Sequence, residues 1–201
     1  MTGSNGRKRM GILVFSDLHA NKKALEELLP TLRQADLSVF CGDFLGYGKD
    51  IDYCVKAVLK EVDLVVLGDH ERMAITDENL ENQPPIVKDS ALYTRRNLSP
   101  KQKNLLSSLP TEIWHENIYV THSINDDYLR NKQDFMRLYK KTRKETKYIL
   151  FGHTHEQVSF RYKNLTFINP GSITKGRRGF KRGYAIITSD KVDFVTLEDI
   201  L

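Results

Sequence analysis

The sequence predicts an α/β fold of the four-layer αββα sandwich type, in which two mixed β-sheets pack together and helices lie on the outside. Two observations support this prediction. Short apolar runs alternate with helix-patterned segments over the first half of the chain, which is typical of parallel strands joined by crossover helices. After a helical middle, the second half returns to strand patterns, two of which are divided by polar turns into hairpins.

The first half contains three predicted strands and two predicted helices. The strands cover residues 10–17, 37–43 and 63–69, and the helices cover residues 21–34 and 50–61. Pro30 is expected to bend or interrupt the first helix, because proline removes a backbone donor and its ring clashes with the preceding turn.

The rest of the chain is predicted from similar patterns. Residues 84–98 have apolar side chains at helical spacing, and residues 99–110 begin with the capping-box pattern of Ser99 and Gln102. Two single strands and two hairpins are expected after these helices, at residues 117–123, 147–153, 157–169 and 183–198.

The length and composition limit the class of protein. The 201 residues are 40% hydrophobic, enough for one good-sized core, so we expect one domain over residues 10–201 after a flexible N-terminus of residues 1–9. No run reaches the roughly 18 apolar residues of a membrane span, and no signal-peptide pattern is present, so a cytoplasmic protein without a membrane partner is expected. Cys41 and Cys54 are expected to be reduced core residues.

The net charge of +5 is concentrated in two basic stretches, residues 137–147 and 174–183. Such a surface attracts polyanions. A solvated helix face is the favoured interpretation of the first stretch, whereas a solvated loop and a polyanion-binding loop remain equal alternatives for the second.

Polar side chains follow five of the predicted strands, at the point where each strand ends. They are Asp17, His19, Asp43, Asp69, His70, His122, His153 and His155. Ligands bind at the carboxyl ends of strands in an α/β sheet, where loops converge, so we expect these groups to meet at the edge of one sheet. Singly, each could be a turn cap or an ordinary histidine, but the recurrence at five strand ends argues against chance.

The donor types indicate a metal site. Residues two apart in an extended chain point the same way, so Asp17 with His19, and His153 with His155, are each expected to face one space. The donors are oxygen and nitrogen without cysteine, and they suffice for two first-row divalent ions, with Asp43 as the natural bridge between them.

The motif series "DLH", "GD", "GDHE", "TH" and "GHTH", in this order from Asp17 to His155, resembles the calcineurin-like metallophosphoesterase superfamily. The stretches "GDFLGYGKD", "NLSPKQKNLLSSLP" and "INPGSI" are similar to small single-domain bacterial phosphoesterases of that superfamily. The resemblance covers the chain from about residue 11 onward.

The resemblance implies a dinuclear metal-dependent phosphoesterase. One ion would be held by Asp17, His19 and His155, the other by Asp69, His122 and His153, and Asp43 would bind both. A metal-bridging hydroxide would attack phosphorus in line, with His70 as the general acid that protonates the leaving oxygen. Manganese is the first expectation for both ions, and iron, cobalt, nickel and zinc accept the same donors.

Two residues depart from the family pattern. Asp69 stands where the family has asparagine, and an ionised Asp69 removes one positive charge from the site. This charge predicts a bias toward monoanionic phosphodiesters over dianionic monoesters, or a site that holds a trivalent ion. Tighter binding of the second metal is the alternative. Ser123 stands where many relatives have glycine and is expected to narrow the approach to His122.

The substrate is expected to be a small phosphodiester, with a phosphomonoester or nucleotide as further candidates. Arg177 and Arg178, in the basic loop 174–183, are the predicted contacts to the substrate phosphate. Two other functions remain open: a nuclease that uses this loop to bind DNA or RNA through Arg177, Arg178, Lys181 and Arg182, and a catalytically weak scaffold, because the superfamily includes a trafficking-coat subunit.

Overall fold

The computed structural model describes residues 10–76 and 80–200, so the N-terminus expected to be flexible, residues 1–9, lies outside the described part. The described residues form two five-stranded sheets. The first sheet has the order β10-β9-β1-β2-β3, with β1 (Ile12–Phe15), β2 (Leu37–Phe40), β3 (Leu64–Val65), β9 (Gly183–Thr188) and β10 (Lys191–Thr196). The second has the order β4-β5-β6-β8-β7, with β4 (Glu112–His115), β5 (Ile118–Thr121), β6 (Tyr148–Leu150), β7 (Gln157–Tyr162) and β8 (Leu165–Pro170).

Both sheets are mixed, as predicted. In the first, β1 pairs in parallel with β2, and β2 with β3, whereas β9 joins β1 antiparallel. In the second, β5, β6 and β8 are parallel neighbours, and β4 and β7 are antiparallel edges. The helices are α1 (Lys22–Leu32), α2 (Ile51–Glu61), α3 (Asp69–Ile75), α4 (Pro85–Asn97), α5 (Pro100–Ser107) and α6 (Lys132–Lys141), with a short 3-10 turn over Leu80–Asn82.

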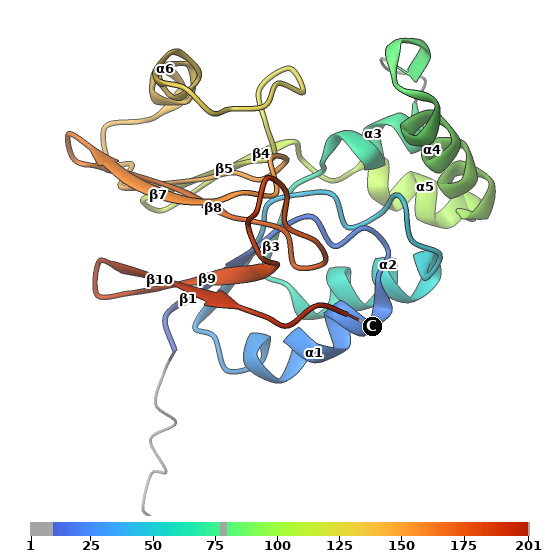
Figure 1. Ribbon diagram of the computed structural model, residues 1–201, viewed down its shortest axis with the longest axis horizontal. Helices are drawn as coiled ribbons and strands as arrows, with labels where there is room; N and C mark the ends of the chain where they lie inside the picture. Colours follow the sequence, from blue (N-terminus) through green and yellow to red (C-terminus); the bar gives the residue numbers. More distant parts are fainter. Residues whose placement is uncertain (1–9, 77–79, 201) are drawn as a thin grey trace, which may run out of the picture.

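The layers follow from the alternation of side chains along each strand. In β1, Leu13 and Phe15 pack in the core beneath α1 and α2, whereas Val14 lies in the core between the sheets. In β6, Leu150 faces that same inner core, and Ile149 packs in the outer core with Leu138 of α6. Figure 1 shows the result, with α1 and α2 outside one sheet, α6 outside the other, and α3, α4 and α5 at one end. The predicted αββα sandwich is confirmed.

Local sequence explains several helix ends. The Asn21 side chain accepts a hydrogen bond from the backbone of Ala24 at 3.0 Å and starts α1. The predicted interruption at Pro30 is wrong, because α1 continues to Leu32 with Pro30 inside it. The capping box that begins α5 is present, with Ser99 N donating to Gln102 Oε1 at 2.9 Å.

Three elements differ from the predicted ones. Strand β4 was not predicted; all four of its residues are only partly buried, so its sequence carries little alternation. Helix α3 begins at Asp69, where the strand was expected to end. Helix α6 starts before the basic stretch 137–147 and ends within it, and only Leu138 of this helix is fully buried.

Within residues 10–76 and 80–200, none of the helices has the length and apolar character that crossing a lipid bilayer requires. Cys41 and Cys54 are both buried and free of disulfides, as expected for core residues.

Candidate metal centre

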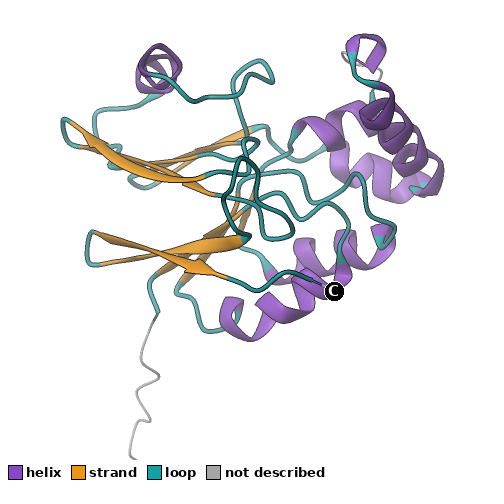
Figure 2. Cartoon of the chain, viewed as in Figure 1, coloured by secondary structure: helices purple, strands orange, loops and turns teal. Residues whose placement is uncertain are grey.

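The predicted metal ligands lie beyond the carboxyl ends of five strands, in loops except for Asp69, which begins α3. Asp17 and His19 follow β1, Asp43 follows β2, and Asp69 follows β3, whereas His122 follows β5, and His153 and His155 follow β6. The expectation that they share the edge of one sheet is wrong, because β5 and β6 belong to the second sheet. Figure 2 shows the loops gathered between the strands of both sheets and helices α3 to α5. The site therefore forms where two packed sheets end together.

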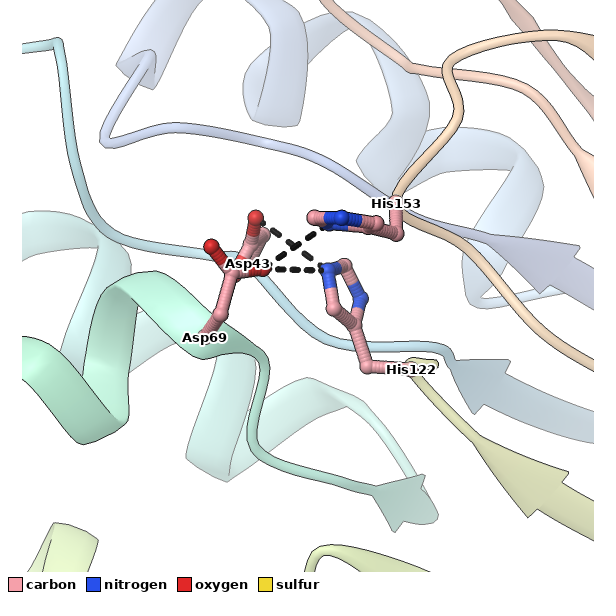
Figure 3. Close-up of side chains that lie close together, drawn as sticks. All are labelled: Asp43, Asp69, His122 and His153. Carbon is pink, nitrogen blue, oxygen red and sulfur yellow. Dashed lines mark hydrogen bonds and ion pairs between the residues drawn. The ribbon is translucent and has the colours of Figure 1, made fainter. Parts of the chain in front are cut away.

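One group of donors consists of Asp43, Asp69, His122 and His153, which each offer one ligand atom within 4.8 Å of the others (Figure 3). Asp69 Oδ1 lies 3.0 Å from His122 Nε2 and 3.0 Å from His153 Nδ1. His122 Nε2 is also 3.3 Å from Asp43 Oδ2. All four side chains are buried.

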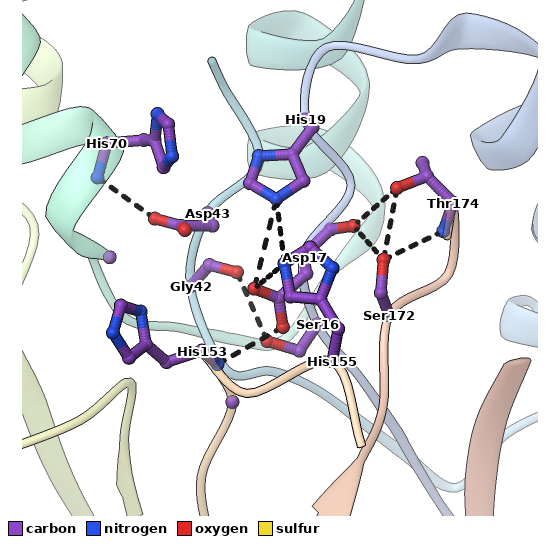
Figure 4. Close-up of polar contacts among 12 residues, drawn as sticks. Ser16, Asp17, His19, Gly42, Asp43, His70, His153, His155, Ser172 and Thr174 are labelled. Carbon is purple, nitrogen blue, oxygen red and sulfur yellow. Dashed lines mark hydrogen bonds and ion pairs between the residues drawn. The ribbon is translucent and has the colours of Figure 1, made fainter. Parts of the chain in front are cut away.

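A second group consists of Asp17, His19 and His155, again within 4.8 Å of one another (Figure 4). His155 Nε2 lies 3.1 Å from Asp17 Oδ1 and 3.1 Å from His19 Nε2. Asp43 forms a third such group with His19 and His70. Asp43 is thus close to ligand atoms of both sets, which is the position that a bridging carboxylate needs.

The donor set fits divalent cations. Asp17 Oδ1 is buried and makes no hydrogen bond within residues 10–76 and 80–200, although imidazole nitrogens of His19 and His155 face it. A buried carboxylate oxygen without a partner is costly, and a cation would satisfy it. Carboxylate and imidazole donors without thiolates suit manganese, iron, cobalt, nickel and zinc.

The close approach of these groups shifts their pKa values. Burial and the neighbouring Asp69 carboxylate raise the pKa of Asp43 well above its usual value. Burial would raise the pKa of Asp69 as well, but hydrogen bonds from His122 and His153 hold it well below the usual value. Two buried carboxylates therefore compete for the imidazole of His122, and a cation between them would relieve this competition.

The backbone at the site is strained. Asp17, His19, Asp43, His153 and His155 all have positive φ, between 50° and 70°. Non-glycine residues rarely adopt this left-handed conformation, which costs about 1 to 3 kcal/mol for each residue and concentrates at functional sites. The prediction that Asp17 and His19 face one space is borne out, although left-handed turns rather than extended chain bring them together. The same prediction for His153 and His155 is wrong, because they belong to different donor groups.

Glu71 holds the backbone beside the metal ligands in place through hydrogen bonds, a role that the sequence did not reveal. Its fully buried carboxylate accepts hydrogen bonds from the backbone N–H groups of Asp43 at 3.0 Å, Leu45 at 2.7 Å and Gly68 at 2.8 Å. Burial raises the pKa of Glu71 to about 7, and the three backbone donors oppose this rise. A Cβ on Gly68 would lie 1.9 Å from Asp43 Oδ1, so only glycine allows these loops to approach so closely.

The "INPGSI" stretch supports the opposite side of the site. Asn169 Nδ2 donates to the carbonyl of Gly152 at 2.7 Å and to Thr154 Oγ1 at 3.0 Å, so it holds the loop that carries His153. Ser172 Oγ donates to the Asp17 carbonyl at 2.8 Å (Figure 4). Sequence reasoning used this stretch only as flanking similarity, although a buried asparagine and serine beside a site are a sign of such support.

His70, the predicted general acid, lies beside the donors. Its backbone N–H donates to Asp43 Oδ1 at 3.0 Å, and its ring lies 5.0 Å from the His19 ring. Burial lowers the pKa of His70 to about 4. The ring is therefore neutral at pH 7 unless a bound anion stabilises its proton.

The arginine side chains of the basic loop 174–183 have different surroundings. Arg177 borders the cavity above the donors, together with Tyr128 and His70. Arg178 instead lies 3.8 Å from Glu156. Arg182 is buried and donates to Glu27 at 2.7 Å, so its predicted role in nucleic-acid binding is wrong. Ser123 borders a separate cavity of about 390 Å³ beside His122.

The amino-acid sequence matches a known protein family. The calcineurin-like phosphoesterase superfamily domain matches residues 10–192, so the chain belongs to that superfamily. The chain is also 31% identical over 109 residues to an uncharacterized protein, MJ0912, of Methanocaldococcus jannaschii. That match spans 53% of this chain and 44% of the relative, less than half of its length.

Solved structures share the fold. A metallophosphoesterase from Sphaerobacter thermophilus is 24% identical, with a TM-score of 0.79 over 94% of this chain and 89% of that chain. A candidate diadenosine tetraphosphatase is 19% identical, with a TM-score of 0.61 over 94% of this chain and 95% of that chain. At these sequence identities, the similarity to the two solved structures shows a shared fold.

Proposed function

We propose that the protein is a dinuclear metal-dependent phosphoesterase that hydrolyses a small phosphodiester, with nucleotides and phosphomonoesters as further substrates. One observation carries this proposal: buried Asp43 lies in one group of donors with His153 and in another with His19, so it links the two sets of ligands. A phosphoesterase of two divalent ions requires such a shared carboxylate.

In this proposal Asp17, His19 and His155 hold one ion, and Asp69, His122 and His153 hold the other. Asp43 is the ligand common to both. When bound, the ions supply positive charge for the phosphoryl oxygens and a water molecule activated for in-line attack on phosphorus. Manganese is the proposed ion, because it accepts both carboxylate and imidazole donors. Iron, cobalt, nickel and zinc accept the same donors and are the alternatives.

His70 is the proposed proton donor to the leaving oxygen. Its ring lies beside His19 and Asp43 and lines the hollow next to the metal ligands. Because burial favours the neutral ring, we propose that the negative charge of the bound phosphoryl group helps His70 to hold the proton that it delivers. Arg177 is the proposed contact to a substrate phosphate oxygen, and Arg178, farther out, a second one.

Asp69 is proposed to bias the site toward diesters. Its carboxylate accepts from both His122 and His153, so an asparagine there could keep the same oxygen in place while adding one positive charge to the site. A dianionic monoester would gain more from that charge than a monoanionic diester.

The proposal is tested by metal analysis and a hydrolysis screen. The purified chain, reconstituted with Mn²⁺, is expected to bind two ions and to hydrolyse an aryl phosphodiester. Asp43→Asn is expected to lower the metal content, because it removes the shared carboxylate. A chain that binds no Mn²⁺ and hydrolyses neither diesters nor monoesters would instead leave the scaffold function standing.

The role of His70 is tested through the leaving group. His70→Ala is expected to slow hydrolysis by about 10²- to 10⁴-fold for a diester with an alkoxide leaving group, which needs a proton. The loss should be much smaller for a nitrophenolate, which leaves without one. His115→Ala is the matched control, because His115 lies in β4, outside both donor groups. Equal losses for both leaving groups would reject the general-acid role.

A further inference from the structure

Tyr47 stands at the rim of the donor cluster. Its ring lies 4.5 Å from the His70 ring and 4.9 Å from the His19 ring, measured between centroids. The side chain is nevertheless 42% exposed. A large aromatic ring beside buried catalytic groups, and open to solvent, is placed to contact a bound molecule rather than to fill the core.

The turn that carries Tyr47 is built to hold it there. Tyr47 has a φ of 53°, a left-handed conformation that costs free energy and persists where surrounding contacts enforce it. Its backbone N–H donates to Ser90 Oγ of α4 at 2.6 Å. A Cβ on Gly46 would lie 2.3 Å from His70 Nδ1, so the turn packs directly against the His70 ring.

Tyr47 borders three neighbouring hollows, each of which it helps to line. The inner one, of about 80 Å³, is lined by Asp43, Asp69 and His70 and has room for a phosphoryl-sized group. The middle one, of about 580 Å³, lies toward His19, Ile86 and Lys175, and is in the size range of small-ligand pockets. The outer one, of about 410 Å³, is bounded by Ile86 and Tyr93 of α4.

Exposed apolar side chains continue outward from Tyr47. Ile86 is 69% exposed and Tyr93 is 41% exposed. Together with Tyr47 they form a short apolar strip that begins at the donor cluster and runs along α4. The strip is too small for a macromolecular interface, but it matches the face of one planar ring system.

A positive charge separates the inner hollow from the middle one. Arg177 borders both, and its Nη1 donates to the Tyr128 hydroxyl at 3.1 Å. Tyr128 in turn stacks on His153, with ring centroids 4.4 Å apart. Within the described part of the chain, no ion pair with a carboxylate is found for Arg177, so its charge is available to a phosphate in either hollow.

From this arrangement we propose that Tyr47, Ile86 and Arg177 form a subsite for the nucleoside of a nucleotide phosphoester. The phosphoryl group occupies the inner hollow, Arg177 contacts it, and the base packs on Tyr47 and Ile86 in the middle hollow. This subsite deepens the proposed phosphoesterase function by naming its substrate class. A nucleotide fits because its ribose links a planar base to a phosphate a short distance away, and the structure places an aromatic–aliphatic surface beside a cation.

The first test is equilibrium binding. Calorimetry compares non-hydrolysable phosphonate analogues of adenosine 5′-monophosphate and ribose 5-phosphate, which differ by the base alone, with the purified protein before and after addition of Mn²⁺. Stacking of one base on an aromatic ring corresponds to an affinity gain of about 5- to 150-fold. The wild-type protein is expected to bind the adenosine analogue more tightly by a factor in this range.

Variants assign the preference to Tyr47. Tyr47→Ala should abolish the difference between the two analogues, whereas Tyr47→Phe keeps the ring and should retain it. Phe180→Ala is the matched control: Phe180 is 43% exposed in the same basic loop as Arg177 and should leave the preference unchanged. Arg177→Gln should weaken both analogues by the same factor, because it removes a phosphate contact and not a base contact.

Equal binding of the two analogues by the wild-type protein, or a preference that survives in Tyr47→Ala, would overturn the subsite. Hydrolysis of phosphoesters is measured separately. A chain that prefers the adenosine analogue but hydrolyses nothing supports the subsite and removes the enzyme, whereas a chain that hydrolyses esters without any base preference does the reverse.

Discussion

Replacement of Glu71 is the sharpest test of how the site is supported. The Glu71 carboxylate is fully buried and accepts three backbone hydrogen bonds, two at Oε2 from Asp43 and Gly68 and one at Oε1 from Leu45. These bonds tie the loop after β2 to the start of α3. Glu71 therefore holds Asp43 and the backbone beside Asp69 in one arrangement.

The expected cost follows from the number of donors that lose their acceptor. A buried N–H without a partner costs about 1 to 3 kcal/mol. Glu71→Ala leaves three such groups, so it is expected to lower the free energy of unfolding by about 3 to 9 kcal/mol. The upper end of this range approaches the whole stability of a typical domain. Glu71→Gln is milder: its carbonyl oxygen can replace Oε2 and keep two bonds, while its amide group faces the Leu45 donor. We expect it to cost about 1 to 3 kcal/mol, the penalty for a single lost acceptor.

Two measurements check this prediction. Urea unfolding of the metal-free protein gives the change in the free energy of unfolding, and Mn²⁺ titration gives the change in metal affinity. Loss of a hydrogen-bond partner that orients metal ligands typically lowers affinity by about 10- to 100-fold, and we expect Glu71→Gln to fall in this range. Glu145→Gln is the control, because Glu145 is exposed. If Glu71→Gln unfolds and binds Mn²⁺ like the wild type, the supporting role is refuted.

Three further predictions concern charge, metal and thiols. Asp69→Asn should lower the ratio of diesterase to monoesterase kcat/KM, because the added positive charge favours the dianion; an unchanged ratio on matched aryl esters would contradict the charge argument. Mn²⁺ at about 100 times its Kd should raise the free energy of unfolding by about 2.7 kcal/mol for each site, seen as a higher Tm that a chelator reverses. Burial raises the pKa of Cys54 to about 12 and that of Cys41 well above its usual value, so both thiols stay protonated at pH 8. A thiol reagent should label them at the rate of unfolding, and immediate labelling of the folded protein would contradict the buried positions.

The fold was predictable where a local pattern reports burial. The strands that became β1, β2 and β6 are short apolar runs, buried at nearly every position, and these were predicted within a few residues. Strand β4 was missed because its residues are half-buried at a sheet edge and show no clear alternation. Helix α1 was expected to bend or break at Pro30; it does not break, because tertiary packing of Leu25, Leu28 and Leu32 keeps the chain helical beyond the missing hydrogen bond.

The candidate site was predictable in its donor types and less so in its geometry. A polar residue at the end of an apolar run is visible in sequence, and this is why Asp17, Asp43 and His122 could be singled out. Glu71, Asn169 and Ser172 also stand at the ends of apolar runs, but their role was not readable there, since they act through hydrogen bonds to the backbone of other loops. Arg182 looked like one more loop cation, and only its burial against Glu27 shows otherwise.

By itself, the sequence determined most of the segments that form strands and helices, and which donors stand at the strand ends, because side-chain periodicity and local backbone preference are properties of neighbouring residues. Only the tertiary structure decided that the ends of β1, β2 and β3 meet those of β5 and β6, and that Tyr47 lies beside His70. The physical reason is that such meetings depend on how two sheets pack face to face. Packing is set by the whole core, and no short stretch of the chain encodes it.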